Sequence, residues 1–333
     1  MRGVGRVERL VDWAASRGLL PPWEQVAHHP IFASFPAPFV TSSNISVDYL
    51  GVRTQPEMLP ERLHGHPDVC HQPQIPPFDE EYFEWIDVLQ AVAEARDRFT
   101  MIEVGAGYAR WAARGWVAAR RHGLAAHVVV VEAEPQHAQW ARTHLAFNGV
   151  PDQDVTFHDS AVGSAAGSTI FVVGMPPGAP GNSARDWYGQ AVAWPGLDER
   201  QKSADSYFGK PVLELEQGWR GVRVPMQTLD SILEQFSDID LVDFDVQGGE
   251  ADIIRASIDA LTAKVRRLHI GTHSREIDAE LPRILAPAGW HCLQAYPCLR
   301  WNRTPFGWIS FGDGVQSWIN PNAPPILRGY DAF

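Results

Sequence analysis

Cysteine and long apolar runs are both scarce in this sequence. Its 333 residues include three cysteines, too few for a disulfide framework, so we expect a protein of the reducing cytoplasm. No run approaches the roughly 20 apolar residues that span a bilayer. Residues 6–18 have the spacing of an amphipathic helix and do not form a signal peptide. We therefore expect a cytoplasmic protein with no membrane partner.

Basic residues are also few. The chain has 28 Lys and Arg against 40 Asp and Glu, and its formal net charge is −12. Because nucleic-acid binding relies on clustered positive charge, we expect no nucleic-acid partner. The most basic stretch, 110–121, repeats its arginines at helical spacing, which is typical of a solvent-exposed helix face.

The composition favours a packed core, and strand patterns alternate with helix patterns. Hydrophobic residues make up 45% of the chain and charged residues 20%. Short apolar runs predict strands, and helical periodicity predicts helices between them. Strands are expected over 99–104, 127–131, 155–158, 170–173, 222–225, 239–245 and 266–271. One helix is expected to follow the first of these strands and to end at 121, and the other helices are expected over 135–147, 227–236, 249–262 and 275–287. This alternation predicts an α/β fold of the Rossmann-like kind, with a doubly wound sheet.

Three segments depart from this alternation. Residues 1–97 form a Pro-rich N-terminal extension that ends in a helix, which Asp79 can cap. An irregular insert over 174–220 interrupts the central domain, 98–295, and is expected to be an active-site cover or a disordered excursion. Residues 296–333 form a C-terminal extension of strands and turns. Aromatic residues of the insert can either line that cover or anchor it on the core: Trp187, Tyr188, Tyr207 and Phe208.

The first predicted strand ends in a glycine loop, Glu103-Val-Gly105-Ala-Gly107. The glycines permit a sharp turn and a close approach of a ligand to the backbone. A dinucleotide-binding loop would have its third glycine where this chain has Arg110. Glu103 would repel a pyrophosphate, whereas it favours a cofactor that carries an ammonium group. A purely structural glycine turn is the alternative.

Two further loops extend the predicted cofactor site. Glu132 ends the second strand, and its carboxylate can accept hydrogen bonds from both hydroxyls of a ribose. Glu134 competes for this role, and its structural alternative is an exposed acid at a helix start. After the third strand, Asp159 or Ser160 can bind the exocyclic amine of adenine.

Together these motifs resemble the FkbM-type S-adenosylmethionine-dependent methyltransferases. The resemblance covers about residues 99–290 and is most specific in TLDSIL…DIDLVDFDVQGGEADII, where the family commonly carries LD…IDLLKIDVEGAE. The chain has Asp243 in place of the family's usual lysine and Gln247 in place of its usual glutamate. The resemblance implies a class I methyltransferase fold, S-adenosyl-L-methionine as cofactor, and binding by Glu103, Gly105, Ala106, Gly107, Tyr108, Glu132, Ala133, Asp159, Ser160, Ala161 and, beside the sulfonium, Asp245.

Candidate catalytic groups follow the fourth and fifth strands. Asp243, Asp245 and Glu250 could together hold Mg²⁺. We favour instead Asp243 as a structural acid paired with an arginine and Glu250 as a helix-start residue, and we expect no resident metal.

His273, at the end of the fifth strand, has an ordinary pKa suited to a general base, and Asp245 is the second catalytic candidate. His269 lies on the same side of the strand as His273, and the two could bind zinc. We favour instead a hydrogen-bonded histidine of the core for His269. The segment HGHPDVCH likewise predicts a solvated loop, because no second pair of zinc ligands follows it.

The function that these residues favour is O-methylation of a hydroxyl on a small-molecule or carbohydrate-like acceptor. An N-methyltransferase is a rival that would need no strong base. A nicotinamide-dependent oxidoreductase is disfavoured by Arg110 and Glu103. A non-catalytic methyltransferase-fold module for assembly or sensing is the further alternative, and it would tolerate the loss of Asp245 or His273.

Overall fold

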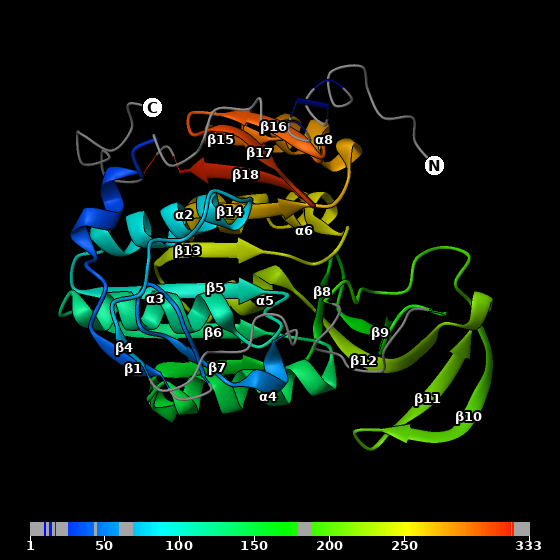
Figure 1. Ribbon diagram of the computed structural model, residues 1–333. Helices are drawn as coiled ribbons and strands as arrows, with labels where there is room; N and C mark the ends of the chain where they lie inside the picture. The colour runs from blue at the N-terminus through cyan, green and yellow to red at the C-terminus, as the bar shows by residue number, and fades with distance from the viewer. Residues whose placement is uncertain are drawn as a thin grey trace.

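The computed structural model describes residues 10, 13, 14, 17, 26–42, 45–59, 69–178, 188–320 and 322. Its centre is a sheet of seven strands with helices on both faces (Figure 1). The strands are β5 (Arg98–Val104), β6 (Ala125–Val131), β7 (Val155–His158), β13 (Ile239–Phe244), β14 (Val265–Thr272), β15 (His291–Tyr296) and β18 (Gly314–Ile319). Their order across the sheet is β15-β18-β14-β13-β5-β6-β7. The expected Rossmann-like α/β fold is therefore confirmed.

Five neighbouring strands of this sheet run parallel, from β14 through β13, β5 and β6 to β7. Both faces of a parallel sheet are covered by helices, which explains why the strand sequences are apolar runs and not alternating patterns. The chain runs from β5 outward to β7 and then returns to β13 on the other side of β5. Such a reversal of strand order opens a crevice at the carboxyl ends of the strands, where α/β proteins bind ligands.

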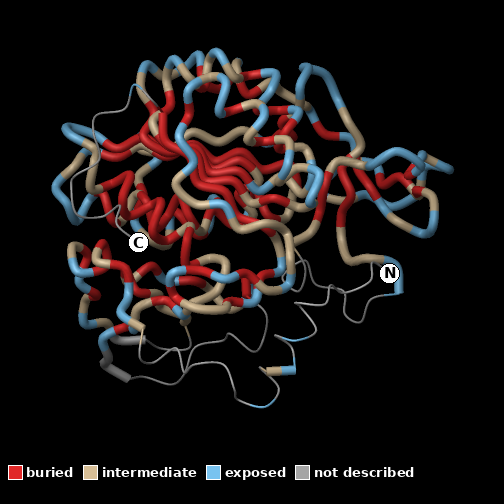
Figure 2. Tube along the Cα trace, turned by 90° about the horizontal axis from the view of Figure 1, so that it is seen from above, coloured by how far each residue is buried: buried red, intermediate tan, exposed pale blue. Residues whose placement is uncertain are grey.

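Two sets of helices cover the sheet. On one face lie α2 (Glu81–Glu94), α3 (Arg110–Arg121) and α4 (Pro135–Phe147), and on the other α5 (Leu229–Leu233), α6 (Glu250–Ala256), α7 (Ile258–Lys264) and α8 (Arg275–Leu285). Figure 2 shows the buried strands stacked at the centre of the molecule. Asp79 caps α2 as predicted, because its Oδ1 accepts a hydrogen bond from the Tyr82 backbone N–H at 3.1 Å. The single helix expected over 249–262 is instead divided at Ser257 into α6 and α7.

The C-terminal segment, expected as an extension, contributes a strand to the central sheet. β18 lies between β14 and β15 and runs antiparallel to both. All six of its residues are buried. The hairpin of β16 (Trp301–Thr304) and β17 (Gly307–Ser310) precedes it. Local sequence does not reveal this placement, since the pairing partners of β18 come from two earlier parts of the chain.

The insert over 174–220 contains regular structure, contrary to the expectation of an irregular segment. It holds a hairpin of β10 (Glu199–Tyr207) and β11 (Lys210–Leu215), which projects from the body of the molecule (Figures 1 and 2). The hairpin belongs to a second sheet with β8 (Ala161–Gly163), β9 (Gly167–Val172) and β12 (Arg220–Thr228). β10 is mostly polar and exposed, so it lacks the apolar signal by which a strand is recognised.

The N-terminal segment packs on α2 and α3 through short elements. These are η2 (Pro30–Ser34), η3 (Pro56–Met58), the strand pair β1 (Val40–Ser42) and β4 (Val69–His71), and the strand pair β2 (Ser46–Val47) and β3 (Arg53–Thr54). Phe32 packs against Tyr82, and Tyr49 packs edge-to-face on Trp85. Most of the helix expected over 6–18 lies outside the described residues, as do His64, His66 and the side chains of Cys70 and His71. Within the described part of the chain, no helix has the length and apolar character needed to cross a membrane.

Candidate functional site

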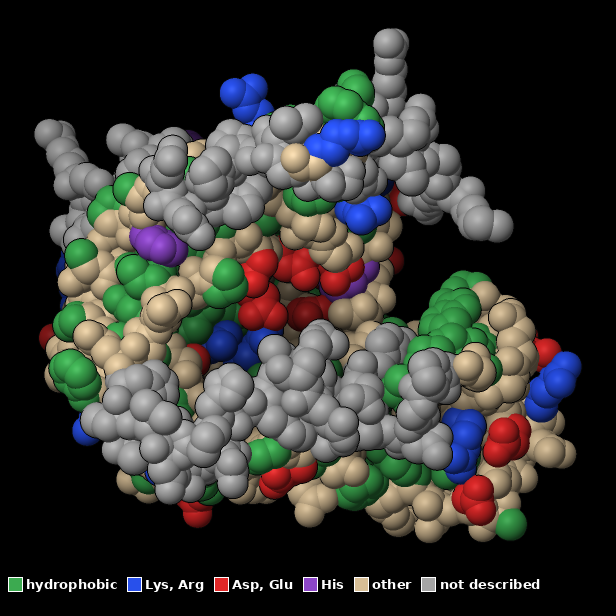
Figure 3. All heavy atoms as spheres, viewed as in Figure 1, with side chains coloured by type: hydrophobic (Ala, Val, Ile, Leu, Met, Phe, Trp, Pro, Cys, Tyr) green, Lys and Arg blue, Asp and Glu red, His purple; other side chains and the backbone are tan. Residues whose placement is uncertain are grey.

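A cavity of about 960 Å³ opens where β5, β6 and β13 end. Every residue predicted to bind the cofactor lines it except Asp159. Figure 3 shows the hollow on this face, in which Asp and Glu side chains gather above a smaller group of Lys and Arg. The predicted cofactor residues other than Asp159 therefore share one cavity.

The glycine loop is shaped by the backbone of the neighbouring strand. Gly105 has φ +84° and Gly107 has φ +54°, both in the left-handed region that favours glycine. A Cβ at Gly105 would overlap the Asp245 carbonyl oxygen. The backbone N–H groups of Gly105 and Ala106 donate to the Val131 carbonyl at 2.9 and 3.1 Å. The loop is thus held between the ends of β6 and β13, on the wall of the cavity.

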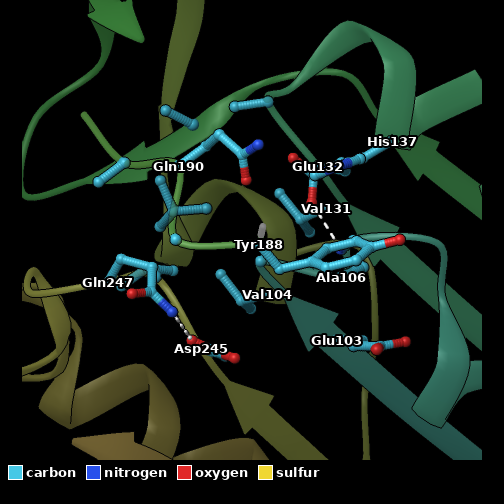
Figure 4. A pocket seen from close by; sticks show the side chains of 18 of the residues that line it. Glu103, Val104, Ala106, Val131, Glu132, His137, Tyr188, Gln190, Asp245 and Gln247 are labelled. Atoms are coloured by element: carbon cyan, nitrogen blue, oxygen red, sulfur yellow. Dashed lines mark hydrogen bonds between the residues drawn. The ribbon is translucent and has the colours of Figure 1, made fainter. Parts of the chain in front are cut away.

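Glu103 supports the helix that follows this loop. Its two carboxylate oxygens accept hydrogen bonds from the backbone N–H groups of Trp111 and Ala112 at 3.2 and 2.7 Å, which caps the start of α3. In Figure 4 the Glu103 carboxylate points away from Asp245. Burial, together with the charge of Asp243, raises the pKa of Glu103 to about 8. Both oxygens of Glu103 thus already bind the start of α3, which argues against the prediction that this acid binds the methionine tail of the cofactor.

Glu132 lies beside the glycine loop. Its Oε2 accepts from the Gly107 backbone N–H at 2.6 Å, and its Oε1 accepts from the Glu134 backbone N–H at 2.7 Å (Figure 4). Burial raises the pKa of Glu132 to about 8. Glu134 itself is fully buried and not exposed as expected; it caps α4 by accepting from the His137 N–H at 2.8 Å. Of the two acids, Glu132 is the one that lines the cavity.

The adenine-binding candidates separate in space. Ser160 lines the cavity, and its hydroxyl oxygen accepts from Gln227 Nε2 at 2.9 Å. Asp159 does not line the cavity; its carboxylate is 61% exposed and pairs with Arg142 at 2.8 Å. The next residue of the loop, Ala161, lines the cavity as well. We therefore retain Ser160 and Ala161 as candidates and withdraw Asp159.

His273 is clamped between two carboxylates. Its Nδ1 lies 2.7 Å from Glu250 Oε1 and its Nε2 lies 3.1 Å from Asp245 Oδ1. Burial lowers the pKa of His273, but the hydrogen bonds to Asp245 and Glu250 outweigh it and raise this pKa to about 11. An imidazole that is already protonated at neutral pH cannot take a proton from an acceptor. His273 therefore does not fit the predicted role of general base, and it does not line the cavity.

Two arginines of α3 are not on a solvent-exposed helix face, contrary to the expectation for 110–121. Arg110 lines the cavity and pairs with Glu81 Oε1 at 2.8 Å. The Arg114 guanidinium lies 4.1 Å from the ring centroid of Trp85 and donates to Asp48 at 2.8 Å. The N-terminal segment and α2 cover this side of α3, so helical periodicity alone could not reveal the burial.

Four acids that line the cavity were not predicted from the sequence: Glu81, Glu84, Asp313 and Asp252. The first two are three residues apart on α2 and therefore lie on one helix face. The spacing of Glu81 and Glu84 could have revealed them as a pair, but the helix that carries them was predicted as part of the N-terminal extension and not of the site. Asp313 belongs to the C-terminal segment, and its Oδ2 lies 4.0 Å from His273 Nε2. With Asp243 and Asp245, these four acids make the lining strongly acidic.

Among the aromatic residues of the insert, Tyr188 reaches the cavity. Its ring stacks on His137 at 4.5 Å, and its hydroxyl donates to the Met58 carbonyl at 2.7 Å (Figure 4). Tyr207 instead anchors the hairpin by donating to Glu134 at 2.7 Å. Phe208 is 46% exposed at the hairpin turn. Trp187 lies outside the described residues.

A curated relative agrees with the resemblance found in the motifs. A curated protein of Jannaschia sp. (strain CCS1), named "Putative methyltransferase", is 26% identical over 286 residues, which are 85% of this chain and 95% of that protein. Among solved structures, Methyltransferase FkbM from Methylobacillus flagellatus KT aligns with 12% identity and a TM-score of 0.39 over 74% of this chain and 56% of that one. Precorrin-6y C5,15-methyltransferase from Geobacter metallireducens GS-15 aligns with 11% identity and a TM-score of 0.38 over 71% of this chain and 85% of that one.

The family comparison covers the glycine loop and the strands that follow it. The Methyltransferase FkbM domain matches residues 103–285, more than half of the 333 residues. That range begins at Glu103 and includes the β13 motif on which the resemblance was based. The chain belongs to the FkbM methyltransferase family.

Proposed function

We propose that this methyltransferase moves the methyl group of S-adenosyl-L-methionine to a hydroxyl of a small-molecule or carbohydrate-like acceptor. The observation that carries the proposal is the position of Glu132 beside the Gly105–Gly107 loop, at the switch point of the sheet. When bound, the cofactor supplies an electrophilic methyl group on a sulfonium centre. The chain's own residues bind it, orient it and handle the proton of the acceptor.

The donor set of the cavity fits this cofactor. The glycine loop lets a ligand approach the backbone, Glu132 offers carboxylate oxygens to a ribose, and Ser160 and Ala161 lie where the third strand ends. The acids of the lining outnumber its single arginine among the described residues, Arg110. Such a lining attracts the positive sulfonium and ammonium groups of the cofactor and repels a pyrophosphate, which supports this cofactor over a nicotinamide dinucleotide.

The acceptor side of the proposal rests on Asp245. Its carboxylate is 57% exposed, lines the cavity, and accepts from Gln247 Nε2 at 2.9 Å. Asp245 is therefore the group we assign to accept the hydroxyl proton, in place of His273. Ligand pockets commonly measure about 300–1,000 Å³, so a cavity of about 960 Å³ has room for the cofactor and a small acceptor together.

Methylation of an amine is the second candidate. It is favoured by the acidic lining, which attracts a cationic acceptor, and by the protonated state of His273. A neutral amine needs no strong base before it attacks a methyl group. Hydroxyl and amine acceptors should therefore be screened in parallel.

The first test is a calorimetric titration of the full chain with S-adenosylhomocysteine, with NAD as the control. We expect saturable binding of the homocysteine product and none of NAD. Transfer of a labelled methyl group to hydroxyl and amine acceptors then identifies the substrate class. Absence of binding would overturn the proposal and favour a non-catalytic module for assembly or sensing.

A further inference from the structure

Three potential metal ligands from separate elements meet at the cavity wall. Glu84 of α2, Asp243 of β13 and His269 of β14 each offer a ligand atom, and these atoms lie within 4.8 Å of one another. Asp243 and His269 are direct neighbours across the parallel strand pair. Glu84 and Asp243 also line the cavity. The cluster therefore has one side in the protein core and one side toward the substrate space.

Asp243 has an unmet hydrogen-bonding capacity. It is 3% exposed, and its Oδ1 has no hydrogen-bond partner. Its interaction with the half-buried Glu84 joins two carboxyl groups, which repel each other unless they share a proton or a cation. The arginine partner expected from the sequence is absent among the described contacts of Asp243. A buried acceptor without a partner is costly, and a bound cation would satisfy it.

His269 is oriented as metal-binding histidines usually are. Its Nδ1 lies 2.7 Å from Oδ2 of Asp87, a residue that is 1% exposed. The same Asp87 carboxylate accepts a hydrogen bond from the Ser317 hydroxyl. Because Asp87 engages Nδ1, Nε2 is the nitrogen left for a ligand. A carboxylate that holds the remote nitrogen in this way fixes the ring and raises its basicity toward a metal.

We propose that Glu84, Asp243 and His269 bind a divalent transition-metal ion such as Zn²⁺ or Mn²⁺. An imidazole among the ligands favours these ions over Mg²⁺, which prefers oxygen ligands. Three protein ligands leave coordination positions open, as in catalytic metal sites. Because Glu84 and Asp243 line the cavity, a small molecule bound there could supply an oxygen or nitrogen atom to the ion. The site stands independently of the proposed cofactor.

This site differs from the Mg²⁺ arrangement considered from the sequence. In that arrangement Asp243 would act together with Asp245 and Glu250. The structure instead directs the latter two carboxylates to His273, at 3.1 and 2.7 Å. Asp243 is directed to Glu84 and His269. The ligand set therefore comes from three elements, including a helix outside the matched family range.

The test is direct binding of Zn²⁺ and Mn²⁺ to the full chain after chelator treatment, measured by calorimetry and metal analysis, with Mg²⁺ for comparison. We expect one transition-metal ion per chain and weaker binding of Mg²⁺. Asp243→Asn and Glu84→Gln should each weaken binding by more than about 100-fold, because changes outside the ligand shell already cost about 10- to 100-fold. Asp245→Asn is the matched control on the same strand end and should weaken binding far less, because it removes a neighbouring charge and no ligand atom.

Co²⁺ provides a second readout that does not depend on the variants. Bound to the wild-type chain, it should give visible absorption bands of low-symmetry nitrogen and oxygen coordination, which Zn²⁺ should displace. Lack of stoichiometric binding by the wild-type chain would overturn the proposal. So would binding that Asp245→Asn abolishes and Asp243→Asn preserves. Neither result depends on S-adenosylhomocysteine, so failure of this site and failure of the proposed function are distinguishable.

Discussion

The His273 ring donates from Nδ1 to Oε1 of the fully buried Glu250 at 2.7 Å. The second ring nitrogen meets Asp245 at 3.1 Å, so the imidazolium bridges the start of α6 and the end of β13. This arrangement explains why a histidine at the end of a strand, a position that suits a general base, is a charged structural element here. It also places a fixed positive charge next to the carboxylate that we assign as the proton acceptor.

His273→Gln should lower the free energy of unfolding in a pH-dependent way. The pKa of His273 is about 11 in the folded chain against 6.5 ordinarily. A raised pKa stabilises the folded state fully below pH 6.5, and the effect is lost as pH rises toward 11. The difference between wild type and variant, measured by urea unfolding, should therefore be larger at about pH 6 than at about pH 10. His291→Gln, at an exposed position, is the control, and a pH-independent difference for His273 would contradict the assignment.

Glu132→Ala should weaken binding of S-adenosylhomocysteine without unfolding the chain. Burial raises the pKa of Glu132 to about 8, so at pH 7 its hydrogen bonds are those of a neutral group, about 0.5–1.5 kcal/mol each. A loss of about 2- to 13-fold in affinity for each lost bond is expected. Asp159→Asn removes an acid that pairs with Arg142 outside the cavity and should leave the affinity unchanged. Calorimetry on both variants checks this, with circular dichroism to verify folding. Equal affinities for Glu132→Ala and wild type would remove the ribose assignment.

Gly105→Ala should destabilise the chain more than Gly123→Ala does. Both glycines have positive φ, +84° and +77°, so each alanine pays a backbone cost of about 1–2 kcal/mol. A Cβ at Gly123 meets nothing within 4 Å, whereas one at Gly105 overlaps the Asp245 backbone. This overlap should add about 1–3 kcal/mol, measured by chemical unfolding. Similar losses in the two variants would show that the loop can shift away from β13.

Glu103→Ala should destabilise α3 and leave the cavity acidic. The substitution removes the acceptor for the Trp111 and Ala112 N–H groups, and the loss of such a cap costs about 0.5–2 kcal/mol. Glu103→Gln keeps one acceptor oxygen and should cost less. Unfolding by urea gives the stabilities, and titration with S-adenosylhomocysteine gives the affinities. A large loss of affinity in Glu103→Gln at unchanged stability would restore this acid to the methionine-binding role.

The family motif and the main strands were readable in the sequence because their signals are local. Apolar runs, helical periodicity and the glycines of the Gly105–Gly107 loop all depend on neighbouring residues along the chain. They predicted the parallel sheet, the crevice at its carboxyl edge and the place of Glu132 in it. The β10–β11 hairpin and the place of β18 were not predicted, because polar strands and strands paired with distant segments carry no such local signal.

The chemical state of the site depends on contacts between distant elements. Asp245 and Glu250 keep His273 protonated because the fold brings the start of α6 and the ends of β13 and β14 together, with a carboxylate at each ring nitrogen. Glu84 joins Asp243 and His269 because α2 packs across the sheet, more than 150 positions earlier in the chain. Motif and composition are properties of neighbours in sequence, whereas burial, charge pairing and ligand geometry arise when the chain folds.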